Sequence, residues 1–144
     1  MADTVKVTWG PGLQALMEKF QERPEAMRKA MGTAAYMEGE ETISDAKPLV
    51  PVLHGGLVNS GFCGLPESQG DVVSVTFGFG GVAGSGNQGG VTNEGDVGYA
   101  IYVHEDMTKH HPHGQAKFLE DPLNARKSDM SDRLAGRIED ALPK

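Results

Sequence analysis

The sequence predicts an α+β fold, in which a small antiparallel sheet is packed by a long N-terminal helix and a C-terminal helix. Three observations predict it: a long run of helix-forming residues after Pro24, strict apolar alternation around Val75, and an apolar stripe at helical spacing near the C-terminus. The chain has 144 residues, which is the usual length of one domain. We therefore expect a single domain over residues 1–144.

The N-terminal part is expected to contain one short strand and two helices. Apolar and polar residues alternate over residues 5–9, which predicts a half-buried strand. Helical spacing of apolar residues over 13–20 predicts a short helix, which Pro24 ends or kinks. A longer helix is expected from Pro24 to about Lys47, because Ala, Met, Glu and Lys dominate it and two prolines follow.

The middle of the chain predicts a projecting β-hairpin followed by a glycine-rich arm. Residues 56–65 are interpreted as a glycine-rich strand, and residues 73–79 alternate clearly between apolar and small or polar side chains. Residues 66–71 supply the turn between them. The arm covers residues 78–98, in which nine of 21 residues are glycine. Ordering such a backbone is costly and buries little, so we expect the arm to be mobile.

The C-terminal part predicts one further short element and a helix. Residues 99–103 are interpreted as a third strand or a short helix, followed by a polar link over 104–114. Asp121 is expected to cap the last helix, with Pro122 at its first position. The predicted core-facing stripe of this helix consists of Leu123, Met130, Leu134, Ile138 and Leu142.

Composition limits the classes of function. The formal net charge is −7, so the surface is unsuited to gripping nucleic acid, although an acidic channel would let DNA slide without sticking. Cys63 is the only cysteine, which excludes an intrachain disulfide. The N-terminus lacks a basic region followed by an apolar run, and no stretch of about 18 apolar residues occurs. We expect synthesis and assembly in a reducing cytoplasm.

Two segments separated by the glycine-rich stretch carry a family resemblance. The first reads Ala46-Lys-Pro-Leu-Val-Pro-Val-Leu-His-Gly-Gly-Leu-Val-Asn-Ser60. The second reads Tyr99-Ala-Ile-Tyr-Val-His-Glu105 and continues after a histidine-rich link as Gln115-Ala-Lys-Phe-Leu-Glu-Asp-Pro-Leu123. In this order and length they resemble the tail-completion (tail-component, or "minor capsid") neck proteins of tailed bacteriophages. The resemblance touches most of residues 24–142.

The resemblance implies a virion structural protein without enzymatic activity or cofactor. It implies a homo-oligomeric ring in the neck, between the connector or head-closure protein and the tail terminator or tail-tube proteins, through whose lumen DNA passes. The chain departs from many relatives at 106–114, where a short Glu-x-Gly turn is usual. The residues that we name as candidates for the subunit interface are Leu57, Phe77, Phe79, Tyr99, Tyr102, Glu105, Phe118 and Leu119.

An alternative interpretation of three aromatic residues is core packing. Tyr99, Tyr102 and Phe118 could hold the sheet against the C-terminal helix instead of facing a neighbouring subunit, where aromatic residues carry much of the binding energy. Both interpretations stay open at the level of sequence.

The alternative function is a small metal- or pH-responsive binding module centred on His104–His113. His111 and His113, with His104 added, have the ligand chemistry of a zinc or nickel site, although polar residues of an exposed link are the simpler interpretation. Residues 84–89 match Gly-x-Gly-x-x-Gly, but the glycines that follow do not open a helix, so a nucleotide site is not expected. No spacing supports a Ser-His-Asp triad, and we expect no catalytic residue.

Overall fold

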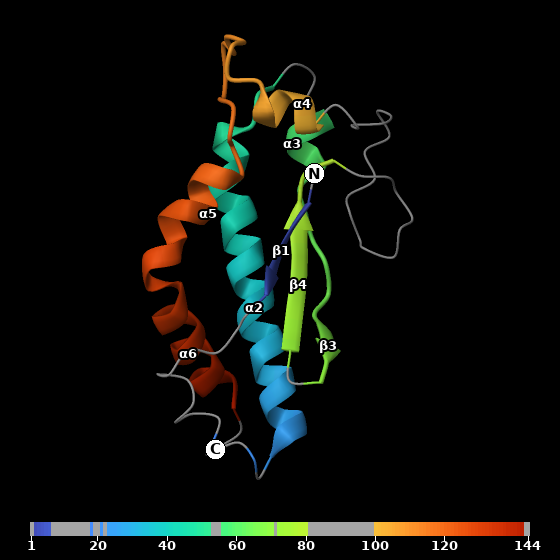
Figure 1. Ribbon diagram of the computed structural model, residues 1–144, viewed down its shortest axis with the longest axis vertical. Helices are drawn as coiled ribbons and strands as arrows, with labels where there is room; N and C mark the ends of the chain where they lie inside the picture. The colour runs from blue at the N-terminus through green and yellow to red at the C-terminus, as the bar shows by residue number, and fades with distance from the viewer. Residues whose placement is uncertain are drawn as a thin grey trace.

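The computed structural model describes residues 2–6, 18, 21, 23–52, 56–70, 72–80 and 100–142. Apart from residue 18, the predicted helix at 13–20 therefore lies outside the described residues, as do the glycine-rich arm beyond Gly80 and Tyr99. The α+β class is confirmed: an antiparallel sheet, the long helix α2 and the C-terminal helices form successive layers (Figure 1).

The sheet is built around its longest strand, β4 (Val72–Gly78). β1 (Ala2–Lys6) pairs with one edge of β4, and β2 (Phe62–Cys63) and β3 (Glu67–Gln69) pair with the other, all antiparallel. Between β2 and β3, residues 64–66 stand opposite only two residues of β4, so this edge contains one extra residue.

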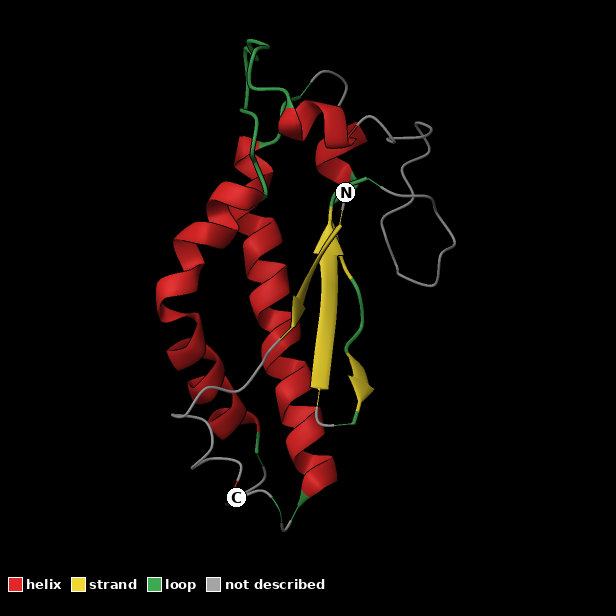
Figure 2. Ribbon diagram, in the orientation of Figure 1, coloured by secondary structure: helices red, strands yellow, loops and turns green. Residues whose placement is uncertain are grey.

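Helix α2 (Pro24–Ala46) lies in the middle of the molecule and is followed by the 3-10 turn η1 (Lys47–Leu49). It packs on the sheet with one side and on the C-terminal helices with the other (Figure 2). Close contact with the sheet requires Gly39, because a Cβ there would lie 2.7 Å from Cys63 Sγ and 3.2 Å from Phe77 Cδ1. The bounds of α2 confirm the helix predicted from Pro24 to about Lys47.

The predicted hairpin forms, with three corrections. Residues 56–59 are the short helix α3 (Gly56–Asn59), not strand, and only Phe62–Cys63 of the predicted strand pair with β4. Residues 67–69, expected in the turn, form β3, and the reversal falls at Gly70, whose φ of 60° favours glycine. The hairpin does not project: alternate side chains of β4 are buried beneath α2.

The regular elements described over residues 100–142 are all helical, and a stretch of turns over 106–119 separates the first from the others. Residues predicted as strand or short helix form α4 (Ala100–Glu105), and the last helix is divided into α5 (Glu120–Arg126), the 3-10 turn η2 (Lys127–Asp129) and α6 (Met130–Ala141). These last elements pack mainly on α2, which separates them from the sheet.

The predicted stripe of the last helix is confirmed, while its predicted cap is not. Leu134 and Ile138 are buried, and the other three stripe residues are half-buried against the core. Asp121 is not the N-cap, because α5 starts one residue earlier. Its carboxylate instead accepts a hydrogen bond from Gln115 Nε2 at 2.7 Å.

Candidate functional site

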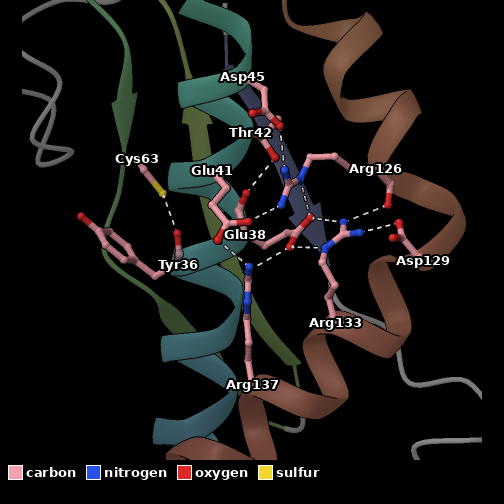
Figure 3. A network of polar contacts seen from close by, with 10 residues as sticks. All are labelled: Tyr36, Glu38, Glu41, Thr42, Asp45, Cys63, Arg126, Asp129, Arg133 and Arg137. Atoms are coloured by element: carbon pink, nitrogen blue, oxygen red, sulfur yellow. Dashed lines mark hydrogen bonds and ion pairs between the residues drawn. The ribbon is translucent and has the colours of Figure 1, made fainter.

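A buried carboxylate surrounded by three arginines joins α2 to the C-terminal helices (Figure 3). Glu38 is 1% exposed and stands near the middle of α2. Arg126 Nε donates to its Oε1 at 2.8 Å, and Arg137 Nη1 donates to its Oε2 at 3.0 Å. Arg133 donates to both oxygens, from Nη2 at 2.6 Å and from Nε at 3.2 Å.

Further carboxylates complete this network on its outer side. Arg137 Nη2 donates to Glu41 Oε1 at 2.6 Å, and Arg126 Nη1 donates to Asp45 Oδ2 at 2.7 Å. Arg126 also pairs with Glu41, and Arg133 pairs with Asp129. The three guanidinium groups therefore find acidic partners on α2 and at the end of η2.

This network was not predicted from the sequence, although the spacing of its acidic and basic residues indicates two charged helix faces. Glu38, Glu41 and Asp45 are spaced by three and four residues and share one face of α2. The three arginines recur at intervals of seven and four residues in the C-terminal helices. Only the packing of one face on the other shows that the two sets belong together.

The arginines keep the carboxylates of this network ionised and paired. Burial alone would raise the pKa of Glu38, but hydrogen bonds from Arg133 and Arg126 outweigh it and lower the pKa to about 2. The hydrogen bond from Arg137 likewise lowers the pKa of Glu41, against a smaller effect of burial. A carboxylate that stays ionised at neutral pH and is fully paired is not poised for proton transfer.

Cys63 is also unsuited to nucleophilic chemistry. Its thiol is buried against α2 and donates to Tyr36 O at 3.7 Å. Burial, with the nearby negative charge of Glu40, raises its pKa to about 12, so it stays protonated. Cys63 therefore acts as a small buried apolar residue of the core.

The two segments that carry the family resemblance meet at one end of the molecule. Gln115 N donates to Leu49 O at 2.8 Å, which links the second segment directly to the first. We call this contact region, formed by residues 46–52, 56–60 and 100–123, the motif junction. At Gly114 (φ 85°) a Cβ would lie within 2.6 Å of three backbone atoms of residues 49–51, so the junction requires glycine there.

The interior of the motif junction is aromatic. Phe118 is fully buried and packs edge-to-face on Phe79, with ring centroids 5.4 Å apart, and on His104 at 5.0 Å. The buried hydroxyl of Ser60 donates to Leu57 O at 2.6 Å and accepts from Gly80 N at 2.8 Å. Ser60 thereby fixes the end of α3 to the chain just after β4.

The predicted interface residues are mostly core residues. Five of the eight have exposed fractions of 3% or less, so their side chains are unavailable to a neighbouring subunit and that prediction has to be corrected: Leu57, Phe77, Phe79, Phe118 and Leu119. For Phe118 the core-packing interpretation holds. Tyr102 belongs to α4, and its side chain lies outside the description. Glu105 is half exposed and pairs with Lys117 Nζ at 2.5 Å.

The histidines do not gather as the alternative binding module would require. Among the described residues, the group that gathers metal-ligand atoms consists of His104, Glu105 and Glu120, and neither His111 nor His113 joins it. The Lys117 ammonium lies within hydrogen-bonding distance of both carboxylates of this group, at 2.5 and 3.0 Å. His104 Nδ1 is 2.7 Å from Glu105 Oε1. The Lys117 ammonium thus balances the negative charges of the two carboxylates at the place where a metal ion would bind.

An open groove runs between the N-terminal half of α2 and the β2–β3 edge. Its volume is about 660 Å³, and its apolar walls come from Tyr36, Met37, Leu65 and Pro66. Leu65 is 68% exposed and Met37 44%, which is high for large apolar side chains. Glu25, Arg28 and Lys29 line the end of the groove near the start of α2.

None of the described helices combines the length and the apolar character that crossing a membrane requires. Comparison of the chain with protein-family models, with curated proteins and with solved structures finds no match.

Proposed function

We propose that this protein is a structural component of the neck of a tailed-phage virion, a tail-completion or head–tail joining protein. Copies form a ring between the connector or head-closure protein and the tail terminator or tail-tube proteins. The observation that carries the proposal is the motif junction. The two segments that resemble the family are 39 residues apart in sequence, from Ser60 to Tyr99, yet they contact each other through Gln115 N and Leu49 O.

The roles of the motif residues support a structural function. Leu57, Ser60 and Phe118 are buried; Phe118 packs on His104 and Phe79, and the two hydrogen bonds of Ser60 fix α3 to the chain just after β4. These motif residues therefore determine the local shape of the protein and do not form a reactive group. The strongest charge cluster among the described residues, around Glu38, is likewise used to join helices.

The net charge of −7 suits a wall past which DNA moves. A repulsive lumen keeps the phosphate backbone from adhering, since binding needs clustered Lys and Arg. In a ring with cyclic symmetry, one face of each subunit meets a different face of the next. The protein then acts through adhesion and shape, and it needs no cofactor.

The test is assembly in solution. The purified chain is analysed by sedimentation velocity and negative-stain electron microscopy, alone and mixed with the head-closure and tail-tube proteins encoded near it. Closed rings, or co-assembly with either protein, are expected. A chain that stays monomeric in every mixture contradicts the proposal, as does its absence from purified virions by mass spectrometry.

A further inference from the structure

Two faces on opposite sides of the molecule complement each other. One is the groove beside β3, and the other is the outward side of α6, with α2 between them (Figure 2). Neither face is filled by another described segment of the same chain. The groove has a basic end and exposed apolar side chains, whereas the outward side of α6 is acidic and lacks a side chain at Gly136.

The groove face has an apolar middle and a basic end. Leu65 and Met37 supply the exposed apolar surface. At the end nearest the start of α2, Arg28 pairs with Glu25 at 2.7 Å, whereas Lys29 forms no ion pair with a described residue. Arg23, one residue before α2, is also exposed. This end therefore carries an excess of positive charge.

The outward face of α6 is acidic and contains an exposed glycine. Both arginines of this helix, Arg133 and Arg137, turn inward to the network around Glu38. The exposed ionisable residues of α6 are therefore all acidic: Asp132, Glu139 and Asp140. Gly136 is exposed between them, and a Cβ there would meet nothing within 4 Å. Another surface can approach the backbone of α6 closely at this point.

We propose that α6 of one copy lies in the groove of the next copy. This inference rests on the proposed function and identifies the contact that builds the ring. The lengths agree: α6 has 12 residues, about 18 Å, and the α2 wall of the groove from Glu25 to Met37 is also about 18 Å long. The charges agree as well, because the acidic helix meets the basic end.

The direction of the helix follows from the charges. With α6 antiparallel to α2, Glu139 and Asp140 lie next to Arg28 and Lys29. The negative end of the α6 dipole then points to the same cations, which adds to the attraction. One turn earlier, Gly136 lies over Leu65, where the absence of a side chain leaves room for the exposed leucine. Because the two surfaces are different, each copy offers one of each, and the contact propagates around a ring.

Cysteine cross-linking tests this contact directly. In a Cys63→Ala background, Leu65→Cys is placed on one copy and Gly136→Cys on another, and each variant is checked by circular dichroism. After oxidation, the mixture is expected to form disulfide-linked dimers and neither variant alone is expected to do so, because position 65 meets position 136 and not itself. The control is Leu65→Cys mixed with Met107→Cys, whose position is 75% exposed but lies outside both faces. This control mixture should stay uncrosslinked.

Charge reversal gives a second, independent readout. Lys29→Glu is expected to lower the sedimentation coefficient of the assembled form, and mixing it with Asp140→Lys is expected to restore assembly. Lys109→Glu, which is exposed in the 106–114 link, is the matched control and should assemble like the unmodified chain.

The outcomes separate this inference from the proposed function. Rings that form while the 65–136 pair stays uncrosslinked, and while Lys29→Glu has no effect, overturn the α6–groove contact and leave the neck function standing. Cross-linking of Leu65→Cys to itself overturns the inference too, because it shows a symmetric contact. Chains that never assemble, alone or with neck proteins, overturn both.

Discussion

Arg133 on α6 holds both carboxylate oxygens of Glu38 on α2, at 2.6 and 3.2 Å, in a site where Glu38 is almost completely excluded from water. Bidentate pairing of this kind is geometrically selective, because the planar guanidinium matches the carboxylate. It fixes the rotation of α6 against α2. The same pairing turns the arginine inward and leaves the acidic side of α6 outside.

Glu38→Gln is expected to destabilise the fold strongly. The change removes the one charge that faces all three arginines and leaves their guanidinium groups crowded and only partly compensated. Breaking a buried ion pair in this way costs about 3–5 kcal/mol. The free energy of unfolding is measured by urea titration, followed by circular dichroism.

Glu25→Gln is the matched control, because Glu25 also pairs with an arginine but its side chain is 88% exposed. An exposed pair contributes about 0–1 kcal/mol, so the urea midpoint should change little. Equal effects of the two substitutions would show that the network does not hold the helices together.

Acid is expected to weaken the fold through Glu38. Its pKa is about 2 in the folded protein against an ordinary value of 4.5, so the ionised form is favoured by folding. The stabilisation is fully present above pH 4.5 and is lost as the pH falls from 4.5 toward 2. The difference corresponds to about 3 kcal/mol. Urea titrations at several pH values measure it.

The Glu38→Gln variant provides the control for this pH dependence. It lacks the titrating carboxylate, so its stability should fall less steeply between pH 4.5 and 2 than that of the unmodified chain. Parallel curves for the two proteins would assign the acid sensitivity to other carboxylates.

Two glycine substitutions are expected to act in opposite directions. Gly39→Ala puts a methyl group 2.7 Å from Cys63 Sγ, and such overpacking costs about 1–3 kcal/mol. Gly136→Ala meets no atom within 4 Å and should stabilise α6 by about 0.5–1 kcal/mol. Thermal unfolding compares the two. A Gly39→Ala variant as stable as the unmodified chain would mean that α2 can move away from the sheet without cost.

Ser60→Ala is expected to destabilise the motif junction. The buried hydroxyl both donates to Leu57 O and accepts from Gly80 N, and its removal leaves these backbone groups without that partner, at a cost of about 1–3 kcal/mol. Ser68→Ala, in the exposed strand β3, is the control and should be nearly neutral. Amide hydrogen exchange at Gly80 provides a local readout, with faster exchange expected in Ser60→Ala alone.

The long helix and the C-terminal stripe were predictable because their signals are local. The bounds of α2 follow from Pro24, its helix-forming residues and the prolines after it. Leu134 and Ile138 at helical spacing predict a buried face regardless of what covers it. Strand β4 was predictable for the same reason. Apolar and polar residues alternate along it, because the side chains of a strand point to opposite faces in turn.

Segments rich in glycine or in small polar residues were less predictable. Residues 56–59 form a helix because Ser60 closes it with hydrogen bonds to Gly56 O and Leu57 O, and strand propensity gives no hint of this. Residues 67–69 contain no apolar side chain to indicate a strand, and they pair only because β4 presents its edge there.

By itself, the sequence determined the fold class, the two main helices and the central strand, since each depends on periodicity within about 20 residues. The tertiary structure alone decided which charges meet and which side chains remain outside. Glu38 and Arg133 are 95 residues apart, and only the packing of α6 on α2 makes them partners. Tertiary packing elsewhere in the fold likewise buried Phe118 and Leu57 and left Leu65 exposed, because burial depends on what covers a residue and not on the residue itself.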